Sequence, residues 1–365
     1  MNESRRWRRM RRGMTNPWTQ MVKRGDTHMY RISKAVSSSI VVLILSFIAT
    51  GIPAKTNKDS LKRAATNNAA VLWRDPGDIA SRNLFYGPGG KDHEPRGTFT
   101  FEKEDMSGSN PKFDVVDQDG VKWRVKMGPE ARPETVASRL VWGVGYFANE
   151  DFFMPSLHVQ KMQRLRRGRN LVSPDGTVRN VRLKRHLKDQ KKIGAWSWAK
   201  CPFTSTREWY GLRVLMAVMN NWDLKDSNNS VYLTRGEPPE ERYLVSDLGA
   251  SFGTTGLNWM LKGNPTAYCD SKWIKAVSPE FVDFNVPSPP AMNYYIDFPE
   301  LARRLSLLWL GRRIPRTDAR WMGDLLARLS PDQIRDAFRA AGYSSQEIEQ
   351  LSKVVQWRIA ELEKL

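Results

Sequence analysis

The segment NNWDLKDSNN, residues 220–229, is the most informative stretch of the 365-residue sequence. It follows an apolar segment of helical periodicity, residues 204–221, that opens with Ser and Thr capping candidates. Its charged and amide side chains are Asp223, Lys225, Asp226, Asn228 and Asn229. Taken alone, the segment is either a polar loop that caps this helix or the edge of an active site. The sequence on either side of it decides between the two.

Downstream of this segment, the sequence predicts two short strands. They cover residues 230–234 and 242–249 and are separated by a Pro-rich turn. The second ends in VSDLG, residues 245–249, which puts Asp247 at the end of a strand. From about residue 298 to the C-terminus the periodicity becomes largely helical.

Upstream of the segment, alternating apolar and polar residues predict a run of strands. These strands are residues 97–104, 111–120, 121–128, 156–162 and 177–186. Pro133 begins a predicted amphipathic helix of about three turns between the third and fourth strands. Lys126 lies in the third strand, and Glu134 lies in the first turn of the helix.

This order of elements predicts an α+β fold with two lobes. The front lobe, residues 97–192, is rich in strands and carries one helix, and the back lobe, residues 193–365, is mainly helical. Residues 55–96 are polar and turn-rich and are interpreted as an N-terminal extension.

The motifs in this order resemble the protein-kinase-like fold. Asp223-Leu224-Lys225-Asp226-Ser227-Asn228 matches the kinase catalytic loop D-L-K-x-x-N, and Asp247-Leu248-Gly249 is similar to the kinase metal-binding D-F-G. WRVKMG, residues 123–128, is similar to the strand that carries the kinase lysine. The resemblance covers about residues 97–260 and implies a two-lobed kinase-like fold. The segment 220–229 is therefore interpreted as a catalytic loop.

The resemblance implies a role for each matched residue in phosphoryl transfer from ATP with Mg²⁺. Lys126 would contact the donor phosphates, and Glu134 would pair with it, although Glu130 is an alternative partner. Asp223 would accept or orient the acceptor hydroxyl, and Lys225 would neutralise the transferred group. The metal ligands would be Asn228 and Asp247.

The sequence departs from the kinase pattern at several positions. It has no G-x-G-x-x-G, and the candidate for a phosphate-covering loop is the backbone of Ser107, Gly108 and Ser109. The usual His-Arg before the catalytic Asp is replaced by Asn221-Trp222. These departures favour an atypical branch, similar to the secreted and phosphoinositide-kinase-like kinases.

Three functions are compatible with these motifs. The first is an exported atypical kinase that phosphorylates an unknown protein, sugar or lipid hydroxyl. The second is a catalytically silent kinase-fold envelope protein that binds a partner or an anionic polymer. The third is a small-molecule phosphotransferase acting on a sugar or lipid headgroup.

The chain is strongly basic, with a formal net charge of +19. Its densest internal basic run is KMQRLRRGRN, residues 161–170, which is either a solvated loop or a contact for phosphate or lipid. Nucleic acid is an unlikely partner, because this run lacks interleaved aromatic residues that stack on bases.

Residues 1–54 are interpreted as an export signal or membrane anchor. Arg31 and Lys34 precede an apolar core, residues 40–48, which is short for a membrane span. The expected location is extracytoplasmic, secreted or membrane-anchored, with the cytoplasmic face of a membrane as the alternative. A buried strand or helix is the remaining interpretation of the apolar core.

The sequence has only two cysteines, Cys201 and Cys269. One disulfide and two free thiols are both compatible with their positions. The four histidines are scattered without metal-ligand spacing, so no His/Cys metal site is predicted.

Overall fold

The chain divides into two units, Met1–Lys58 and Asp59–Leu365. The computed structural model describes residues 68–108, 110–221, 223–253, 263–286 and 305–365, all of them in the second unit. The predicted export segment, 1–54, lies outside the described residues. In the described part of the chain, no helix combines the length and the apolar character needed to cross a membrane.

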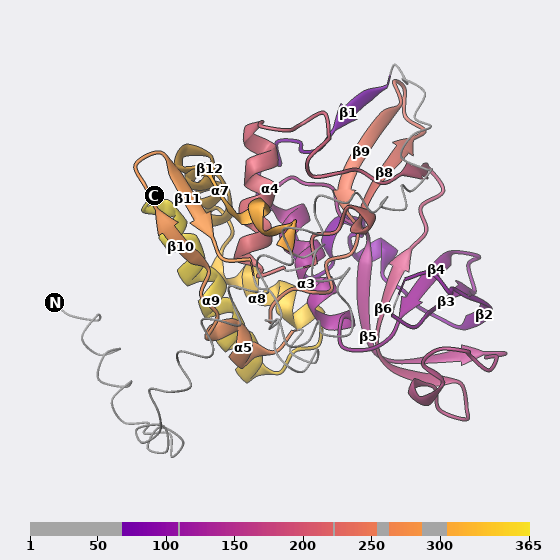
Figure 1. The fold of residues 1–365 in the computed structure, drawn as a ribbon. Coiled ribbons are helices and arrows are strands. Elements are labelled where there is room, and N and C mark those ends of the chain that lie inside the picture. Colours follow the sequence, from indigo (N-terminus) through magenta and orange to yellow (C-terminus); the bar gives the residue numbers. More distant parts are fainter. Residues whose placement is uncertain (1–67, 109, 222, 254–262, 287–304) are drawn as a thin grey trace, which may run out of the picture. The chain divides into compact units, whose positions relative to one another are not determined.

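The front lobe is a closed barrel of five strands in the order β2-β3-β4-β6-β5 (Figure 1). Its strands are β2 (Phe99–Glu104), β3 (Lys112–Asp117), β4 (Lys122–Lys126), β5 (Asp151–Gln160) and β6 (Thr177–Arg185). Side chains alternate between the two faces of each strand, so Trp123 and Val125 of β4 fill the barrel core. Their neighbours Arg124 and Lys126 therefore lie on the outer face.

A short parallel pairing closes the barrel. Phe99 of β2 pairs with Val159 of β5, and Thr100 pairs with Gln160. The remaining strand pairs are antiparallel. Because β6 lies between β4 and β5, residues far apart in the sequence become neighbours on the outer face of the barrel.

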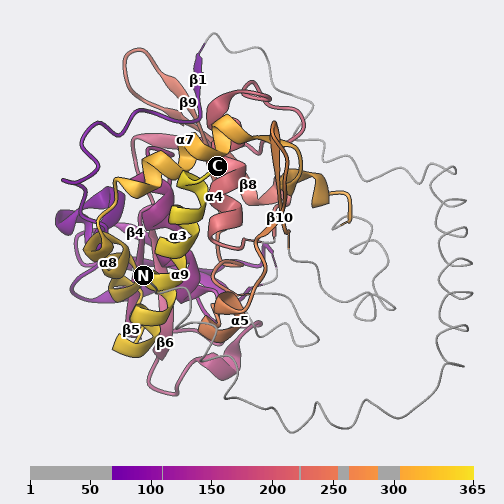
Figure 2. The same cartoon turned by 90° about the vertical axis from the view of Figure 1, so that its left-hand side faces the viewer.

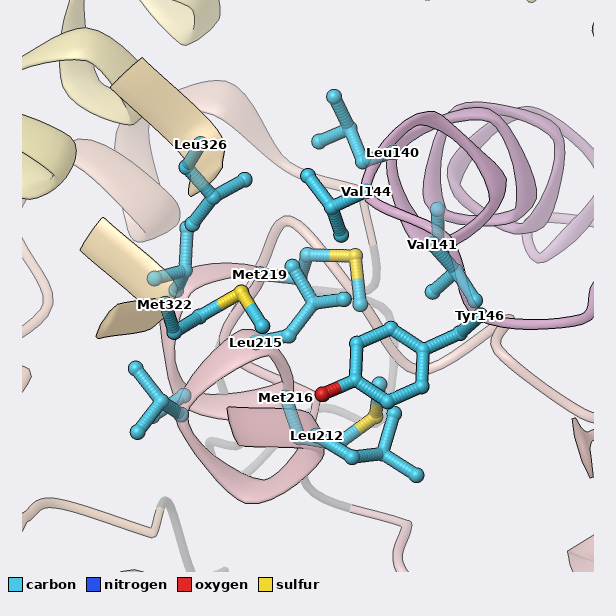
Figure 3. Close-up of a cluster of buried hydrophobic side chains, with 14 of the residues drawn as sticks. Leu140, Val141, Val144, Tyr146, Leu212, Leu215, Met216, Met219, Met322 and Leu326 are labelled. Carbon is cyan, nitrogen blue, oxygen red and sulfur yellow. The ribbon is translucent and has the colours of Figure 1, made fainter. Parts of the chain in front are cut away.

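Helix α3 (Ala131–Gly143) belongs to the core of the helical lobe as much as to the barrel. Its inward side chains Leu140 and Val141, with Val144 at its C-cap, meet those of α4 (Arg207–Val218) and α7 (Arg316–Ala327), as Figure 3 shows. The front lobe therefore has the single predicted helix, but that helix is anchored by the apolar core of the other lobe.

The helical lobe is built from well-capped helices. Thr206 caps α4 by accepting a hydrogen bond from the backbone of Trp209. Ser330 and Ser344 form capping boxes at α8 (Pro331–Ala340) and α9 (Ser345–Glu363), in the region predicted to be largely helical. In Figure 1, α8 lies between α3 and α9. Figure 2 shows the same helices from the side.

A second sheet has four strands that come from three parts of the chain: before the barrel, directly after it, and after helix α4. Its order is β1-β9-β8-β7, with β1 (Ala69–Val71), β7 (Gln190–Gly194), β8 (Asn229–Thr234) and β9 (Glu240–Val245). A three-stranded sheet lies farther along the chain and contains β10 (Ile274–Val277), β11 (Phe281–Phe284) and β12 (Ile314–Pro315), next to the short helix α5 (Pro265–Cys269).

Part of the predicted polar extension 55–96 is integrated into this lobe. Strand β1 pairs in parallel with β9, and Leu72, Ile79 and Leu84 are buried in the helical core. Gln333 of α8 also donates hydrogen bonds to the backbone carbonyls of Ile79 and Arg82. Residues 68–96 therefore contribute to the packing of the helical lobe.

Candidate active site

Lys126, the last residue of β4, lies among three carboxylates. Its Nζ is 2.6 Å from Glu130 Oε2, 2.9 Å from Glu134 Oε2 and 3.0 Å from Asp247 Oδ1. The lysine side chain is only 5% exposed. The structure thus brings together Lys126, Glu134 and Asp247, three of the residues singled out by sequence.

The short connection between β4 and α3 explains why both glutamates reach the lysine. Helix α3 begins at Ala131, with Glu130 at its N-cap position. Residues four apart lie on the same face of a helix, so Glu130 and Glu134 point in the same direction. The eight-residue spacing from Lys126 to Glu134 therefore allows the ion pair, and Glu130 is a second partner rather than an alternative one.

A buried arginine holds the other oxygen of Glu134. Arg182 of β6 donates from Nη2 to Glu134 Oε1 at 2.8 Å, and its Nη1 lies 3.4 Å from Asp151 Oδ1. Arg182 is paired with Lys126 across β4 and β6. Each oxygen of Glu134 therefore contacts its own cation, and the carboxylate is fixed from two sides.

The pKa values of this cluster follow from burial and from these contacts. Burial would lower the pKa of Lys126, but the surrounding carboxylates, with Glu134 the strongest, raise it well above its ordinary value. Burial would raise the pKa of Asp247, but the charge and hydrogen bond of Lys126 hold it well below its usual range. Near neutral pH, Lys126 is a cation and Asp247 is an anion.

Backbone hydrogen bonds place Asn228 next to Asp247. The carbonyl of Asn228 accepts from the backbone N–H groups of Ser246 and Asp247, at 2.7 and 3.1 Å. Asn149 also donates from its side chain to the carbonyl of Ser246. The end of β9 and the start of β8 are thus joined at the point where the two predicted metal ligands lie.

The first two residues of the segment 220–229 cap the preceding helix, because the backbone N–H groups of Asn220 and Asn221 donate to the carbonyls of Ala217 and Met216. Asp223 takes no part in this cap. Asn220 ends α4 in a left-handed conformation, with φ at 55°. Asn221 accepts from the backbone N–H of Asp223, whose carboxylate lies 3.0 Å from Lys225 Nζ. Asn228 donates from its side chain to the carbonyl of Asp223. The two predicted catalytic residues therefore contact one another, in a loop tied to Asn228.

Hydrogen bonds hold the candidate phosphate-covering loop in place. The backbone N–H of Ser107 donates to Asp105 Oδ1 at 2.8 Å. Arg167, from the basic run 161–170, donates to the carbonyls of Asp105, Ser107 and Gly108. Ser109 lies outside the described residues. The basic run thus supports this loop through Arg167.

The glycine of Asp247-Leu248-Gly249 is required by close packing. A Cβ added at Gly249 would lie 2.6 Å from the Cβ of Glu130 and 2.7 Å from its Oε2. Glu130 also accepts a hydrogen bond from Asn110. Glu130 therefore connects the end of the candidate phosphate loop, the lysine and the Asp247 segment.

The fold is kinase-like. The strand barrel with its one anchored helix is followed by α4, the β8–β9 hairpin and the C-terminal helices, in the order that the motifs predicted. The lysine of the barrel and the aspartate after β9 meet although they are 121 residues apart.

No protein-family model matches the chain, and no curated protein matches it in sequence. Among solved structures, the chain is similar to the proinflammatory kinase CtkA of Helicobacter pylori, with 10% identity and a TM-score of 0.41 over 73% of this chain and 96% of that one. It is also similar to the Golgi casein kinase, with 10% identity and a TM-score of 0.29 over 73% of this chain and 74% of that one. The assignment of site residues rests on the contacts described above and not on these likenesses.

Two members of the site were missed by the sequence patterns. Arg182 and Asp151 lie on β6 and β5, and the pairing of β4 with β6 brings Arg182 beside the lysine. The available signal was the alternation in VRLKR, residues 181–185, which places Arg182 and Lys184 on the face opposite Val181 and Leu183. The strand pairing itself was not visible in the sequence.

The residues present fit a magnesium ion bound together with a phosphate. Asp247 Oδ1 contacts Lys126, and its side chain is 39% exposed, so the carboxylate reaches solvent. The side-chain nitrogen of Asn228 is engaged by Asp223, which directs its oxygen away from that bond. Magnesium commonly uses one or two carboxylates and takes its other ligands from water and phosphate. In the described part of the chain, no three His, Cys, Asp or Glu side chains form a metal-binding cluster.

Both cysteines are free thiols. Cys201 is half-buried and Cys269 is exposed. Burial raises the pKa of Cys269 above its ordinary value, so this thiol is less readily ionised than a free cysteine.

The ion pair of Asp114 with Arg124 predicts a dependence of stability on acid. Arg124 donates from Nε and Nη2 to the two oxygens of Asp114, at 2.8 and 3.1 Å. Burial opposes the ionised form, but His186 and Arg124 hold the pKa of Asp114 well below its usual range. A lowered carboxyl pKa stabilises the fold above about pH 4, and this stabilisation is lost as the pH falls through the folded-state pKa.

The free energy of unfolding of the wild type is expected to fall between pH 6 and pH 2.5. In Asp114→Asn this fall should be smaller by about 1–2 kcal/mol. Urea denaturation at the two pH values measures it. Asp119→Asn, in the exposed turn between β3 and β4, is the matched control. The same pH dependence in Asp114→Asn and wild type would show that the pair does not govern acid sensitivity.

Proposed function

We propose that the chain is a phosphotransferase that moves the γ-phosphoryl group of a Mg²⁺-bound nucleoside triphosphate, predicted from sequence to be ATP, to a hydroxyl acceptor. The observation that carries the proposal is the contact of Lys126 Nζ with Glu134 and Asp247. These residues come from the barrel, from α3 and from the loop after β9. Such a contact places a fixed cation beside a carboxylate that has a free edge, which phosphoryl transfer requires.

Each residue of the chain would have a separate role. Lys126 would bind the donor phosphates, while Glu134 and Arg182 hold its side chain in place. Asp223 would accept a hydrogen bond from the acceptor hydroxyl and take its proton. Lys225, 3.0 Å from Asp223, would offset the negative charge of the transferred group.

Asp247 and Asn228 would hold the magnesium ion. When bound, this ion would neutralise charge on the phosphate oxygens and orient the terminal phosphate. The paired backbone hydrogen bonds between Asn228 and the Ser246–Asp247 segment support this assignment, because they keep both ligand side chains at one place.

The acceptor is proposed only as a hydroxyl of a protein, sugar or lipid. The basic run 161–170 is a proposed contact for an anionic surface. Four of its cations, Lys161, Arg164, Arg166 and Arg169, are exposed. They lie next to Arg167, which holds the loop beside Lys126, so an acidic acceptor bound there would lie on the same side of the barrel as this loop.

Export also remains a proposal, resting on residues 1–54 of the sequence. An exported kinase needs a source of nucleotide, because ATP is scarce outside a cytoplasm. Mass spectrometry of the native N-terminus tests export: cleavage near residues 49–54 would support it, and an intact cytosolic N-terminus would exclude a cleaved signal.

Replacing Asp247 by Asn tests the proposed nucleotide site. The change keeps the side-chain volume but removes the charge that would hold the magnesium ion, so the affinity for the Mg²⁺–nucleotide complex is expected to fall at least about tenfold. Isothermal titration of the full chain with ATP, with and without Mg²⁺, measures it. Circular dichroism should show an unchanged fold.

Asp283→Asn is a matched control, because Asp283 lies on β11, in a different sheet from the β8–β9 hairpin. It should bind nucleotide as the wild type does. If the wild type binds no nucleotide at millimolar concentration, or if Asp247→Asn binds as tightly as wild type, the phosphotransferase proposal is wrong. The catalytically silent kinase-fold protein would then be the better account.

A further inference from the structure

Lys184 is a half-buried cation on the same face of the barrel as Lys126, and the proposed chemistry does not use it. It lies on β6 two residues after Arg182, and it pairs across the sheet with Arg124. Lys126 pairs with Arg182, so Lys126 and Lys184 are diagonal neighbours, which in a sheet lie about 7–8 Å apart. Both side chains therefore lie on the same outer face of the barrel.

The two arginines next to Lys184 each form ion pairs with carboxylates, whereas in the described part of the chain the lysine does not. Arg124 is bonded to Asp114 and also contacts Asp105. Arg182 is bonded to Glu134 and Asp151. Among the described residues, no side chain or carbonyl makes a hydrogen bond or ion pair with Lys184.

Holding this cation without a partner has a cost. Burial and the nearby charges of Arg182 and Arg124 lower the pKa of Lys184 to about 8, against the weaker opposing effect of Asp151. The amine still keeps its proton near neutral pH. An unpaired, partly desolvated cation at a cleft is the type of group that a ligand satisfies.

If the triphosphate lies at Lys126, the nucleoside would extend along the barrel face towards Lys184, because the other side of Lys126 is filled. Beyond Lys126 the chain turns into α3, and Glu134 with Arg182 fills that side. In the other direction, β4 and β6 present Arg124 and Lys184.

We propose that Lys184 reads the base of the donor nucleotide and that it favours guanine over adenine. This inference rests on the proposed function, since it assumes that the triphosphate binds at Lys126. A lysine ammonium has only donors. Guanine offers O6 and N7 as two acceptors on one edge, whereas adenine offers N7 next to an N6 amino group that is itself a donor. The predicted ATP would then be the weaker of the two donors.

The test is a comparison of Mg²⁺ complexes of GTP, ITP and ATP binding to the full chain, by isothermal titration at pH 7. Inosine has the O6 and N7 of guanine but lacks its 2-amino group, so it isolates the edge that Lys184 would contact. GTP and ITP should both bind at least about tenfold more tightly than ATP. Lys184→Met should reduce this ratio to about threefold or less, chiefly by weakening GTP and ITP.

Two further variants make the result specific. Lys184→Arg keeps a cation with donors only and should retain the preference for guanine. Arg179→Met removes one charge from an exposed position of the same strand and should leave the ratio unchanged.

The outcomes separate the two proposals. If ATP binds as tightly as ITP to the wild type, or if Lys184→Met keeps the wild-type ratio, the base-reading role is wrong and the phosphotransferase proposal stands. If no nucleotide binds, both are wrong. Should Lys184→Met fail to fold, the wild-type ratio of ITP to ATP affinity decides by itself.

Discussion

Replacing Asp223 by Asn is expected to lower the rate of phosphoryl transfer by about 10³-fold, while Mg²⁺–nucleotide binding stays within about twofold of wild type. The carboxylate of Asp223 belongs to the loop after α4, whereas Lys126 and Asp247 would hold the donor. Asn keeps the shape and one acceptor but cannot take the proton of the acceptor hydroxyl. The loss should therefore fall on the chemical step and not on donor binding.

Release of labelled phosphate from the γ-position, measured in single turnover with water or the chain itself as acceptor, tests this expectation. Asp226→Asn is the matched control in the same loop. Asp226 accepts a hydrogen bond from the backbone of Trp198, and Asn can still accept it, so the rate should change about twofold at most. Equal rates for Asp223→Asn and wild type would remove Asp223 from the mechanism.

Arg182→Met is expected to lower the free energy of unfolding by about 3 kcal/mol. Arg182 is 6% exposed and bonds Glu134 and Asp151, which are both nearly fully buried. Methionine has a similar length but no charge, so two buried carboxylates lose a shared cation. Removing one partner of a buried ion network is costly for this reason, whereas replacing the entire network by apolar residues need not be.

Urea denaturation of the full chain at pH 7 measures this loss. Arg179→Met, on the exposed part of the same strand, should change the free energy of unfolding by about 0.5 kcal/mol or less. If both variants lose the same small amount, Arg182 does not hold the cluster. Nucleotide binding should also weaken in Arg182→Met, because Glu134 loses one of its two cations and no longer fixes Lys126 as firmly.

These contacts bear on how α3 behaves in this chain. Its apolar side chains are part of the core formed with α4 and α7, and Arg132 on its first turn stacks on Tyr343 and bonds Glu347 of α9. In the ion pair between Glu134 and Lys126, the packing of α3 thus holds the glutamate and strand β4 of the barrel holds the lysine. A movement of α3 away from the barrel would have to break packing in both lobes.

The sequence predicted the strands and helices whose signals are local. The alternation in KFDVVD and KWRVK identified β3 and β4, and the helical periodicity of the C-terminal region covers α8 and α9. Strand β5 was placed too late, at residue 156 instead of Asp151, because DFFMP does not alternate and contains Pro155.

Features that depend on strand pairing between distant segments were not predictable from local pattern. The parallel contact of β2 with β5 closes the barrel, and β1 joins β9 from a segment that reads as polar and turn-rich. Arg182 and Lys184 enter the site only because β6 lies beside β4. Lys126, Glu134, Asp223, Asn228 and Asp247 could be named as candidates from the sequence because their order along the chain carries the kinase pattern.

A crystal structure of the full chain with Mg²⁺ and non-hydrolysable analogues of GTP or ATP tests the central claim most directly. The triphosphate is predicted to lie between Lys126 and Asp247, with Mg²⁺ bound by Asp247 and Asn228. A phosphate oxygen should replace at least one of the three carboxylates that contact Lys126. A triphosphate bound elsewhere, or no bound nucleotide at millimolar concentration with all three carboxylate contacts of Lys126 retained, would contradict it.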